Sequence, residues 1–109
     1  MRSKIISSPA EVIDRYTILL LKYQNGINVE KELAPYLEAV VDYAEMYSDR
    51  LYDINSRMWE LEDRITEEGN LKKVGALYMQ LRDLTLQRME VKNEITKKYG
   101  GFKEKKNFI

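Results

Sequence analysis

The sequence predicts an all-α fold in which an N-terminal helix packs on a long antiparallel α-hairpin, completed by oligomerisation. Apolar residues recur at alternating spacings of three and four along two segments, which is the pattern of helices that pack side by side. A short connection around Gly69 joins these segments, so the second must fold back along the first. At 109 residues the chain fits one domain, residues 1–109.

The first predicted helix covers residues 9–25. Ser8 and Glu11 form an S-x-x-E capping box, and Pro9 fits the first turn because its missing N–H is not needed there. Asn25 and Gly26 end the helix. Apolar residues surround most of its circumference, so we expect it to be covered on more than one side.

The second predicted helix covers residues 30–68. Its seam consists of Leu33, Leu37, Val40, Ala44, Tyr47, Leu51, Ile54, Met58, Leu61 and Ile65. Pro35 is expected to kink the helix or to mark the first turn of a fresh one, and Gly69 is expected to be a left-handed cap. At 1.5 Å per residue this helix reaches ~50 Å, which leaves apolar surface that self-association would cover.

The third predicted helix covers residues 71–99 and ends at Gly100. Its seam consists of Val74, Leu77, Leu81, Leu84, Arg88, Val91 and Ile95. The basic tail, residues 100–109, is expected to be a loose end or an arm on a neighbouring subunit.

Composition excludes several classes of function. The 18 basic and 18 acidic residues cancel, which disfavours nucleic acid and anionic membranes as partners. Without cysteine or histidine, the chain cannot form disulfides, Cys/His zinc sites or a histidine-based catalytic site. The longest apolar run, YTILLLKY, is far shorter than the roughly 20 residues that span a bilayer, and the N-terminus lacks a signal-peptide pattern. We therefore expect a cytoplasmic protein without a cofactor.

Arg88 is the one charged residue in the third seam. In one interpretation its guanidinium reaches the edge of the core and is solvated there. In the other it is buried and held by a carboxylate, because an unpaired charge would be costly. Folding the hairpin brings Arg88 near Asn55, and the first helix can supply Asp14 or Glu11.

The stretch NSRMWELEDRI contains the only tryptophan, Trp59, among charged residues. Asn55, Glu62, Tyr52 and Trp59 lie beside the second seam and form a separate flank. Either another helix or subunit covers this flank, or it binds a ligand whose ring stacks on an aromatic side chain. The predicted ligand-binding residues are Asp14, Thr17, Tyr52, Asn55, Trp59, Glu62, Arg88 and Lys92.

An enzymatic alternative rests on paired carboxylates. Glu11 and Asp14, and Glu60 and Asp63, lie one helical turn apart on two helices, as in all-α nucleotide pyrophosphohydrolases that hold Mg²⁺. Such pairs arise often by chance in a chain with 18 acidic residues.

Three pieces of the chain resemble a small all-helical bacterial family that is often encoded near surface-polysaccharide and glycosyltransferase genes. SSPAEVIDRYTILLLK is similar to its S-x-G-E-L-x-D-K-x-T-I-L-x-I-K, NSRMWELEDRI to its N-x-x-L-W-x-I-E-D-x-I, and RMEVKNEI to its R-x-x-L-K-x-x-I. Where that family has Asn-Asp before the arginine, this chain has Thr85-Leu86. The resemblance groups these residues but implies no reaction.

Three hypotheses follow for the function. The first is a non-enzymatic, self-associating binding protein, whose three-helix junction holds a nucleotide or nucleotide sugar with Arg88 and Lys92 on the phosphate. The second is a Mg²⁺-dependent nucleotide hydrolase that uses the four paired carboxylates. The third is a helical adaptor or assembly factor, and a composition rich in Lys, Ile, Tyr and Asn also suits a phage gene.

Overall fold

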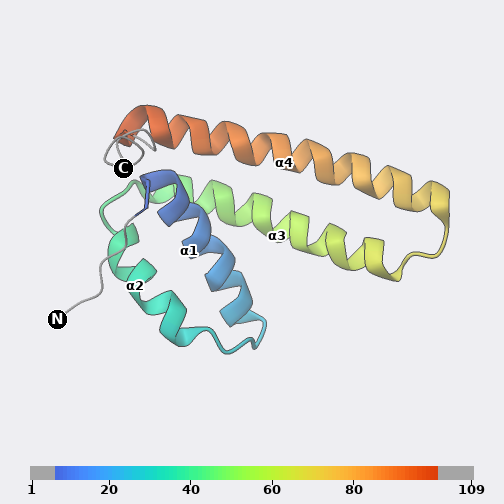
Figure 1. The fold of residues 1–109 in the computed structure, drawn as a ribbon, viewed down its shortest axis with the longest axis horizontal. Helices are drawn as coiled ribbons and strands as arrows, with labels where there is room; N and C mark the ends of the chain where they lie inside the picture. The colour runs from blue at the N-terminus through green and yellow to red at the C-terminus, as the bar shows by residue number, and fades with distance from the viewer. Residues whose placement is uncertain (1–6, 101–109) are drawn as a thin grey trace.

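The computed structural model describes residues 7–100 of the chain, and this part is all-helical. Its helices are α1 (Pro9–Gln24), α2 (Glu30–Val40), α3 (Glu45–Glu67) and α4 (Leu71–Tyr99). Helices α3 and α4 form a long antiparallel hairpin, α1 packs along it, and α2 lies beside α1 (Figure 1). The predicted fold class and the packing of the N-terminal helix on the hairpin are confirmed. The predicted tail, residues 100–109, lies outside the described residues except for Gly100.

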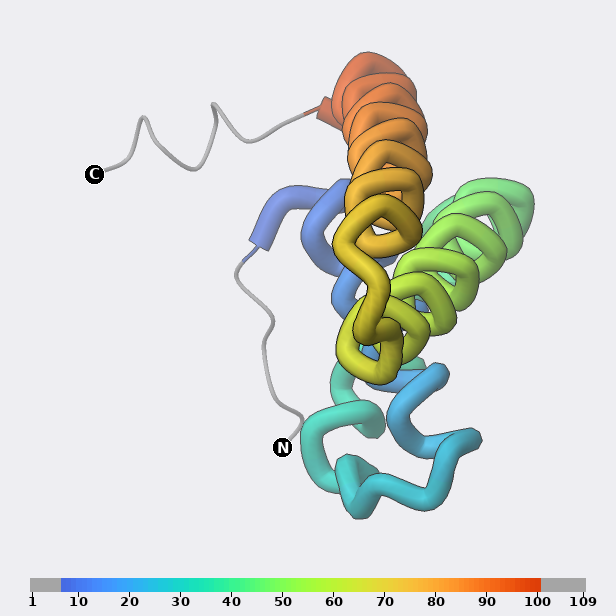
Figure 2. Tube along the Cα trace, turned by 90° about the vertical axis from the view of Figure 1, so that its right-hand side faces the viewer, coloured from blue at the N-terminus to red at the C-terminus, as the bar shows by residue number. Residues whose placement is uncertain are grey.

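Helix α1 begins at the predicted capping box. Ser8 accepts a hydrogen bond from the backbone N–H of Glu11 at 3.4 Å, and Pro9 occupies the first helical position. The helix contacts α2, α3 and α4, which explains why its apolar residues are spread around its circumference (Figure 2).

The prediction of one helix over residues 30–68 is wrong, because residues 41–44 separate α2 from α3. The hydroxyl of Tyr99 accepts a hydrogen bond from the backbone N–H of Ala44 at 2.8 Å, and the rings of Tyr43 and Tyr47 pack edge-on against Tyr99. These contacts with the last turn of α4 hold the chain in an extended conformation at Ala44. Pro35 lies within α2 and does not coincide with the break.

The hairpin core follows the predicted seams from Tyr47 onward. One cluster joins α3 and α4 to the start of α1; its buried members are Ala10, Ile13, Tyr47, Leu51, Ile54, Leu61, Leu77, Leu84, Val91 and Ile95. A smaller cluster of Leu19, Val29 and Leu33 joins α1 to α2. Leu37, predicted as a seam residue, is 47% exposed because the second seam does not continue across the break.

The turn between α3 and α4 differs from the expectation of a left-handed Gly69. Glu68 ends α3 in an extended conformation, and Gly26 and Gly100 are the glycines with positive φ in the described part. The side chain of Asn70 caps α4 by accepting hydrogen bonds from the N–H groups of Lys72 and Lys73 at 2.9 and 3.2 Å. An asparagine at the N-cap therefore replaces the glycine as the residue that shapes this turn.

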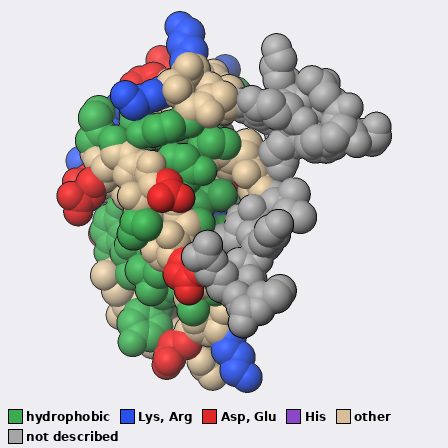
Figure 3. All heavy atoms as spheres, turned by 90° about the vertical axis from the view of Figure 1, so that its left-hand side faces the viewer, with side chains coloured by type: hydrophobic (Ala, Val, Ile, Leu, Met, Phe, Trp, Pro, Cys, Tyr) green, Lys and Arg blue, Asp and Glu red, His purple; other side chains and the backbone are tan. Residues whose placement is uncertain are grey.

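The end of the molecule where α2 turns into α3 carries apolar surface. Val41, the first residue of this turn, and Met46, in the first turn of α3, are exposed. Figure 3 shows apolar side chains spread over this end with acidic side chains among them. Within residues 7–100, no helix is long and apolar enough to cross a membrane.

Candidate ligand-binding site

Asp14 is the centre of a polar network that joins α1, α3 and α4. Its side chain is 3% exposed, and Arg88 holds it with two hydrogen bonds, one of them from Nε at 3.0 Å. Asn55 donates a third hydrogen bond to the same carboxylate at 3.0 Å. The structure therefore agrees with the interpretation that Arg88 is held by a carboxylate of the first helix.

Thr17 fixes the orientation of the Asn55 amide. The Thr17 hydroxyl donates to the carbonyl of Asp14 at 2.7 Å, so it can only accept from Asn55 Nδ2, which lies 2.9 Å away. Both N–H groups of the Asn55 amide are used, one on Asp14 and one on Thr17. The amide oxygen has no donor among the described residues, although Asn55 is only 7% exposed. A buried oxygen without a donor is uncommon and calls for a partner.

Lys92 extends the network toward the start of α1. Its Nζ lies 2.8 Å from Glu11 and 3.7 Å from Asp14 Oδ2. Burial raises the pKa of Asp14, but the hydrogen bonds from Arg88 and Asn55 and the charges of Arg88 and Lys92 outweigh it, so the pKa is lowered. The carboxylate therefore stays ionised inside the fold.

A pocket of about 250 Å³ opens where Trp59 faces α1 and α4. It is lined by Ile18, Leu21, Lys22, Asn55, Met58, Trp59, Glu62 and Arg88. Trp59 is half-buried, and the aliphatic side chains provide the remaining apolar walls. The part of the α3 flank that carries Asn55, Trp59 and Glu62 thus lines a cavity that α1 only partly fills.

The charged groups at this pocket are not all neutralised. Within residues 7–100, Lys22 and Glu62 form no ion pair. Arg88 uses Nε and Nη2 on Asp14, which leaves Nη1 without a hydrogen bond in the same part of the chain. The pocket therefore combines an aromatic wall, two sources of N–H donors and two acceptors, Glu62 and the Asn55 oxygen.

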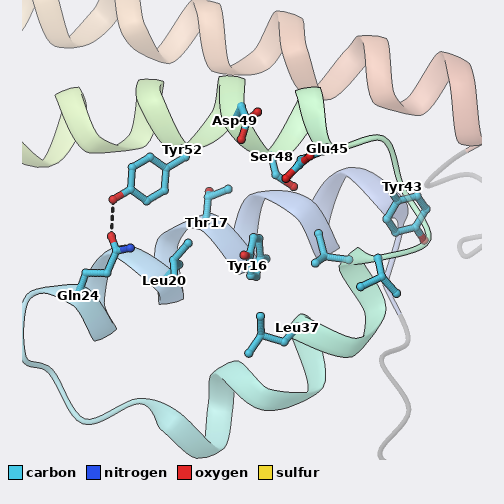
Figure 4. Close-up of a pocket in the computed structure, with 12 residues that line it drawn as sticks. Tyr16, Thr17, Leu20, Gln24, Leu37, Tyr43, Glu45, Ser48, Asp49 and Tyr52 are labelled. Carbon is cyan, nitrogen blue, oxygen red and sulfur yellow. Dashed lines mark hydrogen bonds between the residues drawn. The ribbon is translucent and has the colours of Figure 1, made fainter.

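A second, larger cavity of about 720 Å³ lies between α1, α2 and α3. Tyr52 lines this cavity and donates a hydrogen bond to Gln24, at the end opposite Tyr43 (Figure 4). The structure therefore separates Tyr52 from Trp59, which the sequence analysis had grouped at one ligand. Thr17 also borders this cavity, although its hydroxyl is taken up by the polar network.

The four carboxylates of the enzymatic alternative do not come together. Glu60 and Asp63 are exposed, whereas Glu11 and Asp14 face Lys92 and Arg88. Among the described residues, no group of three or more Asp, Glu, His or Cys side chains is arranged to hold a metal ion.

The structure also brings in residues that sequence reasoning did not assign to the site, namely Ile18, Leu21, Lys22 and Met58. Lys22 had a detectable signal, because it interrupts the apolar run of α1 and belongs to the motif shared with the resembled family. Ile18 belongs to the same motif, but the spacing of the three apolar residues equals that of ordinary core positions and so did not distinguish them.

Comparisons of the chain with known protein families, with curated proteins and with solved structures find no match. The resemblance described above therefore stays a prediction, and the functional argument rests on the geometry of the site.

Proposed function

We propose that this chain is a non-enzymatic binding protein for a small anionic ligand with a planar, N–H-bearing ring, such as a nucleotide or a nucleotide sugar. The ring enters the pocket beside Trp59, and the anionic group lies near Lys22 and Arg88. The observation that carries the proposal is that Asn55, a nearly buried residue, lines this pocket, while its amide oxygen has no donor within residues 7–100. A ring N–H or amino group supplies that donor.

The chemistry of the remaining groups supports the same class of ligand. Glu62 offers a second acceptor for an amino group, and the indole of Trp59 offers a face for stacking, which contributes about 0.5–1.5 kcal/mol beyond area burial. Lys22 is a cation without an ion pair in the described residues, so it is available for a phosphate. Lys92, expected from the sequence to bind phosphate, is engaged by Glu11 and leaves this role to Lys22.

The size of the pocket limits what enters it. A volume of about 250 Å³ is slightly below the ~300 Å³ at which sites for drug-sized ligands begin. One ring system fits inside, and a sugar or phosphate group remains at the rim. We therefore expect the ring to decide specificity and the phosphate to add affinity.

Trp59 provides a direct test because it is the only tryptophan. Nucleosides, nucleotides and nucleotide sugars are titrated against its fluorescence, and thermal unfolding is followed with the same panel. A binder quenches or shifts Trp59 emission and raises Tm in the same concentration range. If no compound in the panel changes either signal, the proposal is overturned.

Matched variants test the recognition of the ring and of the phosphate separately. Lys22→Gln is expected to weaken phosphorylated ligands about tenfold and to leave the matching nucleoside unchanged. Glu62→Gln is expected to change which ring the pocket binds most tightly. Lys31→Gln, an exposed substitution on α2, is the control and should bind as the original chain does. Equal binding by Lys22→Gln and the control would contradict the role of Lys22.

A further inference from the structure

The face of α4 opposite the hairpin core carries a stripe of exposed apolar residues, which the exposed Arg82 interrupts near its middle. Its members are Leu71, Tyr78, Met79, Leu86 and Met89, all more than half exposed, with Leu71 at 86% and Met79 at 67%. On a helix with 3.6 residues per turn they fall within an arc of about 100° that points away from Leu77, Leu84 and Val91. Within residues 7–100, no other part of the chain covers this stripe.

Gly75 lies on the same stripe, and no neighbouring atom in the described part of the chain requires a glycine there. Glycine inside a helix lowers stability relative to alanine. A Cβ added at Gly75 would meet nothing within 4 Å, so the surrounding structure does not require its absence. A glycine is favoured here if a second helix approaches closely at this point.

We propose that this stripe binds the same stripe of a second copy of the chain, with the two α4 helices antiparallel about a two-fold axis at Arg82. In this register Tyr78 faces Leu86 of the partner subunit, and Gly75 faces Met89 of the partner subunit. The Met89 side chain thus enters the space above the glycine, as a knob enters a hole in a coiled coil. This surface is distinct from the Trp59 pocket.

The charges beside the stripe fit a second copy. In an antiparallel pair, residues on one flank meet the same flank of the other helix, and Lys72 and Glu90 lie on one flank of α4. Lys72 of one subunit and Glu90 of the partner subunit then lie within about half a helical turn of each other along the helix axis. The two-fold axis makes this pair occur twice in the dimer. Arg82 lies on the axis, so the two Arg82 side chains approach each other there, and we expect each to turn toward Asp83 of the partner subunit. Within residues 7–100 none of these four residues forms an ion pair, although the charge of Glu90 also acts on Arg50 of the same chain.

The length of the stripe sets the expected strength of the dimer. From Leu71 to Met89 it extends for ~27 Å, and a single helix pair buries less than the ~800 Å² per partner of a standard interface. The dimer is therefore expected to dissociate on dilution.

Sedimentation of the full chain across the micromolar range tests this inference. A monomer–dimer equilibrium is expected, with Tm rising as concentration rises. Met89→Glu should weaken dimerisation by about tenfold or more, because it places an uncompensated charge in the stripe. Met46→Glu, at a similarly exposed methionine on α3, is the control and should dimerise normally. A chain that stays monomeric throughout overturns the proposal and leaves the stripe to a different protein.

Two further variants identify the arrangement. Gly75→Ala should raise Tm of the dilute monomer and weaken the dimer, a combination that a purely intrahelical effect cannot produce. Lys72→Glu and Glu90→Lys should each weaken the dimer, and the double variant should restore it. A dimer that forms but is insensitive to all of these changes uses another surface and contradicts the proposal.

Discussion

Arg88 and Asp14 form a two-pronged ion pair that joins the last helix to the first across a sequence separation of 74 residues. The guanidinium is 29% exposed and the carboxylate 3%, so the negative charge is almost fully removed from water. The pair therefore acts as a structural link between α1 and α4, and it also forms one edge of the Trp59 pocket.

Removing the arginine should destabilise the fold strongly. Arg88→Leu leaves Asp14 buried without its main partner, and we expect a loss of about 2–4 kcal/mol in the free energy of unfolding, reduced from the fully buried case by the partial exposure of Arg88. Arg57→Leu is the control, because its pair with Asp53 is exposed and should contribute less than about 0.5 kcal/mol. Urea denaturation measures both. Similar losses in the two variants would show that the buried ion pair contributes no more to the free energy of unfolding than the exposed one.

Acid should weaken the fold through Asp14. Its pKa in the folded state lies below the ordinary value of 3.8, so the unfolded chain takes up a proton first as the pH falls. The stability that this carboxylate contributes is fully present above pH 3.8 and is lost as the pH falls through the folded pKa. The urea midpoint followed into acid should show this loss.

Two variants assign the acid effect. Asp14→Asn should flatten the dependence on pH below pH 3.8, although the variant is less stable at neutral pH. Glu94→Gln should retain most of the dependence of stability on pH. The pKa of Glu94 is also lowered by its hydrogen bond with Arg50, but this carboxylate is exposed and screened by water. An unchanged slope in Asp14→Asn would contradict the assignment.

The hydroxyl of Tyr99 should stabilise the break between α2 and α3. Tyr99→Phe removes the acceptor for the Ala44 N–H, and we expect a loss of about 1 kcal/mol. Hydrogen exchange at Ala44 should accelerate in the same variant. Tyr23→Phe, at an exposed tyrosine, is the control and should leave both measurements unchanged.

Leu51 should be among the most sensitive core positions. It is fully buried between the helices of the hairpin, and Leu51→Ala is expected to lose about 2–5 kcal/mol through the cavity it creates. Leu37→Ala belongs to the same predicted seam but is 47% exposed, so it should lose much less. Equal losses, measured by urea denaturation, would mean that Leu37 is buried in solution.

The helical periodicity predicted much of the fold because both helices of the hairpin bury one continuous face. The seam residues Tyr47 to Ile65 and Leu77 to Ile95 meet as expected, since spacing alone specifies that face. The break at residues 41–44 had no such signal. The apolar spacing runs through it without interruption, and the contacts that impose it come from Tyr99, far away in the sequence.

The candidate site was predictable where charge had to be compensated. A charged residue in the seam of α4 required a carboxylate, and this requirement indicated Asp14 or Glu11 of the first helix. In the structure Asp14 is the one that binds Arg88. The walls of the pocket were not predictable, because they depend on how α1 crosses the hairpin. The same crossing places Tyr52 and Trp59 on different cavities, although both lie on one side of α3.

The contact between Tyr99 and Ala44 has a consequence for the order of events during synthesis. Ala44 is synthesised long before Tyr99. While residues 30–67 emerge from the ribosome, they therefore lack the Tyr99 hydroxyl that later contacts Ala44 at the break. Their uninterrupted apolar spacing favours one long helix at that stage. The synthesis of α4 then adds the Tyr99 hydroxyl, which accepts the hydrogen bond from the Ala44 N–H. We expect the last turn of α4 to stabilise the break between α2 and α3 only after this point.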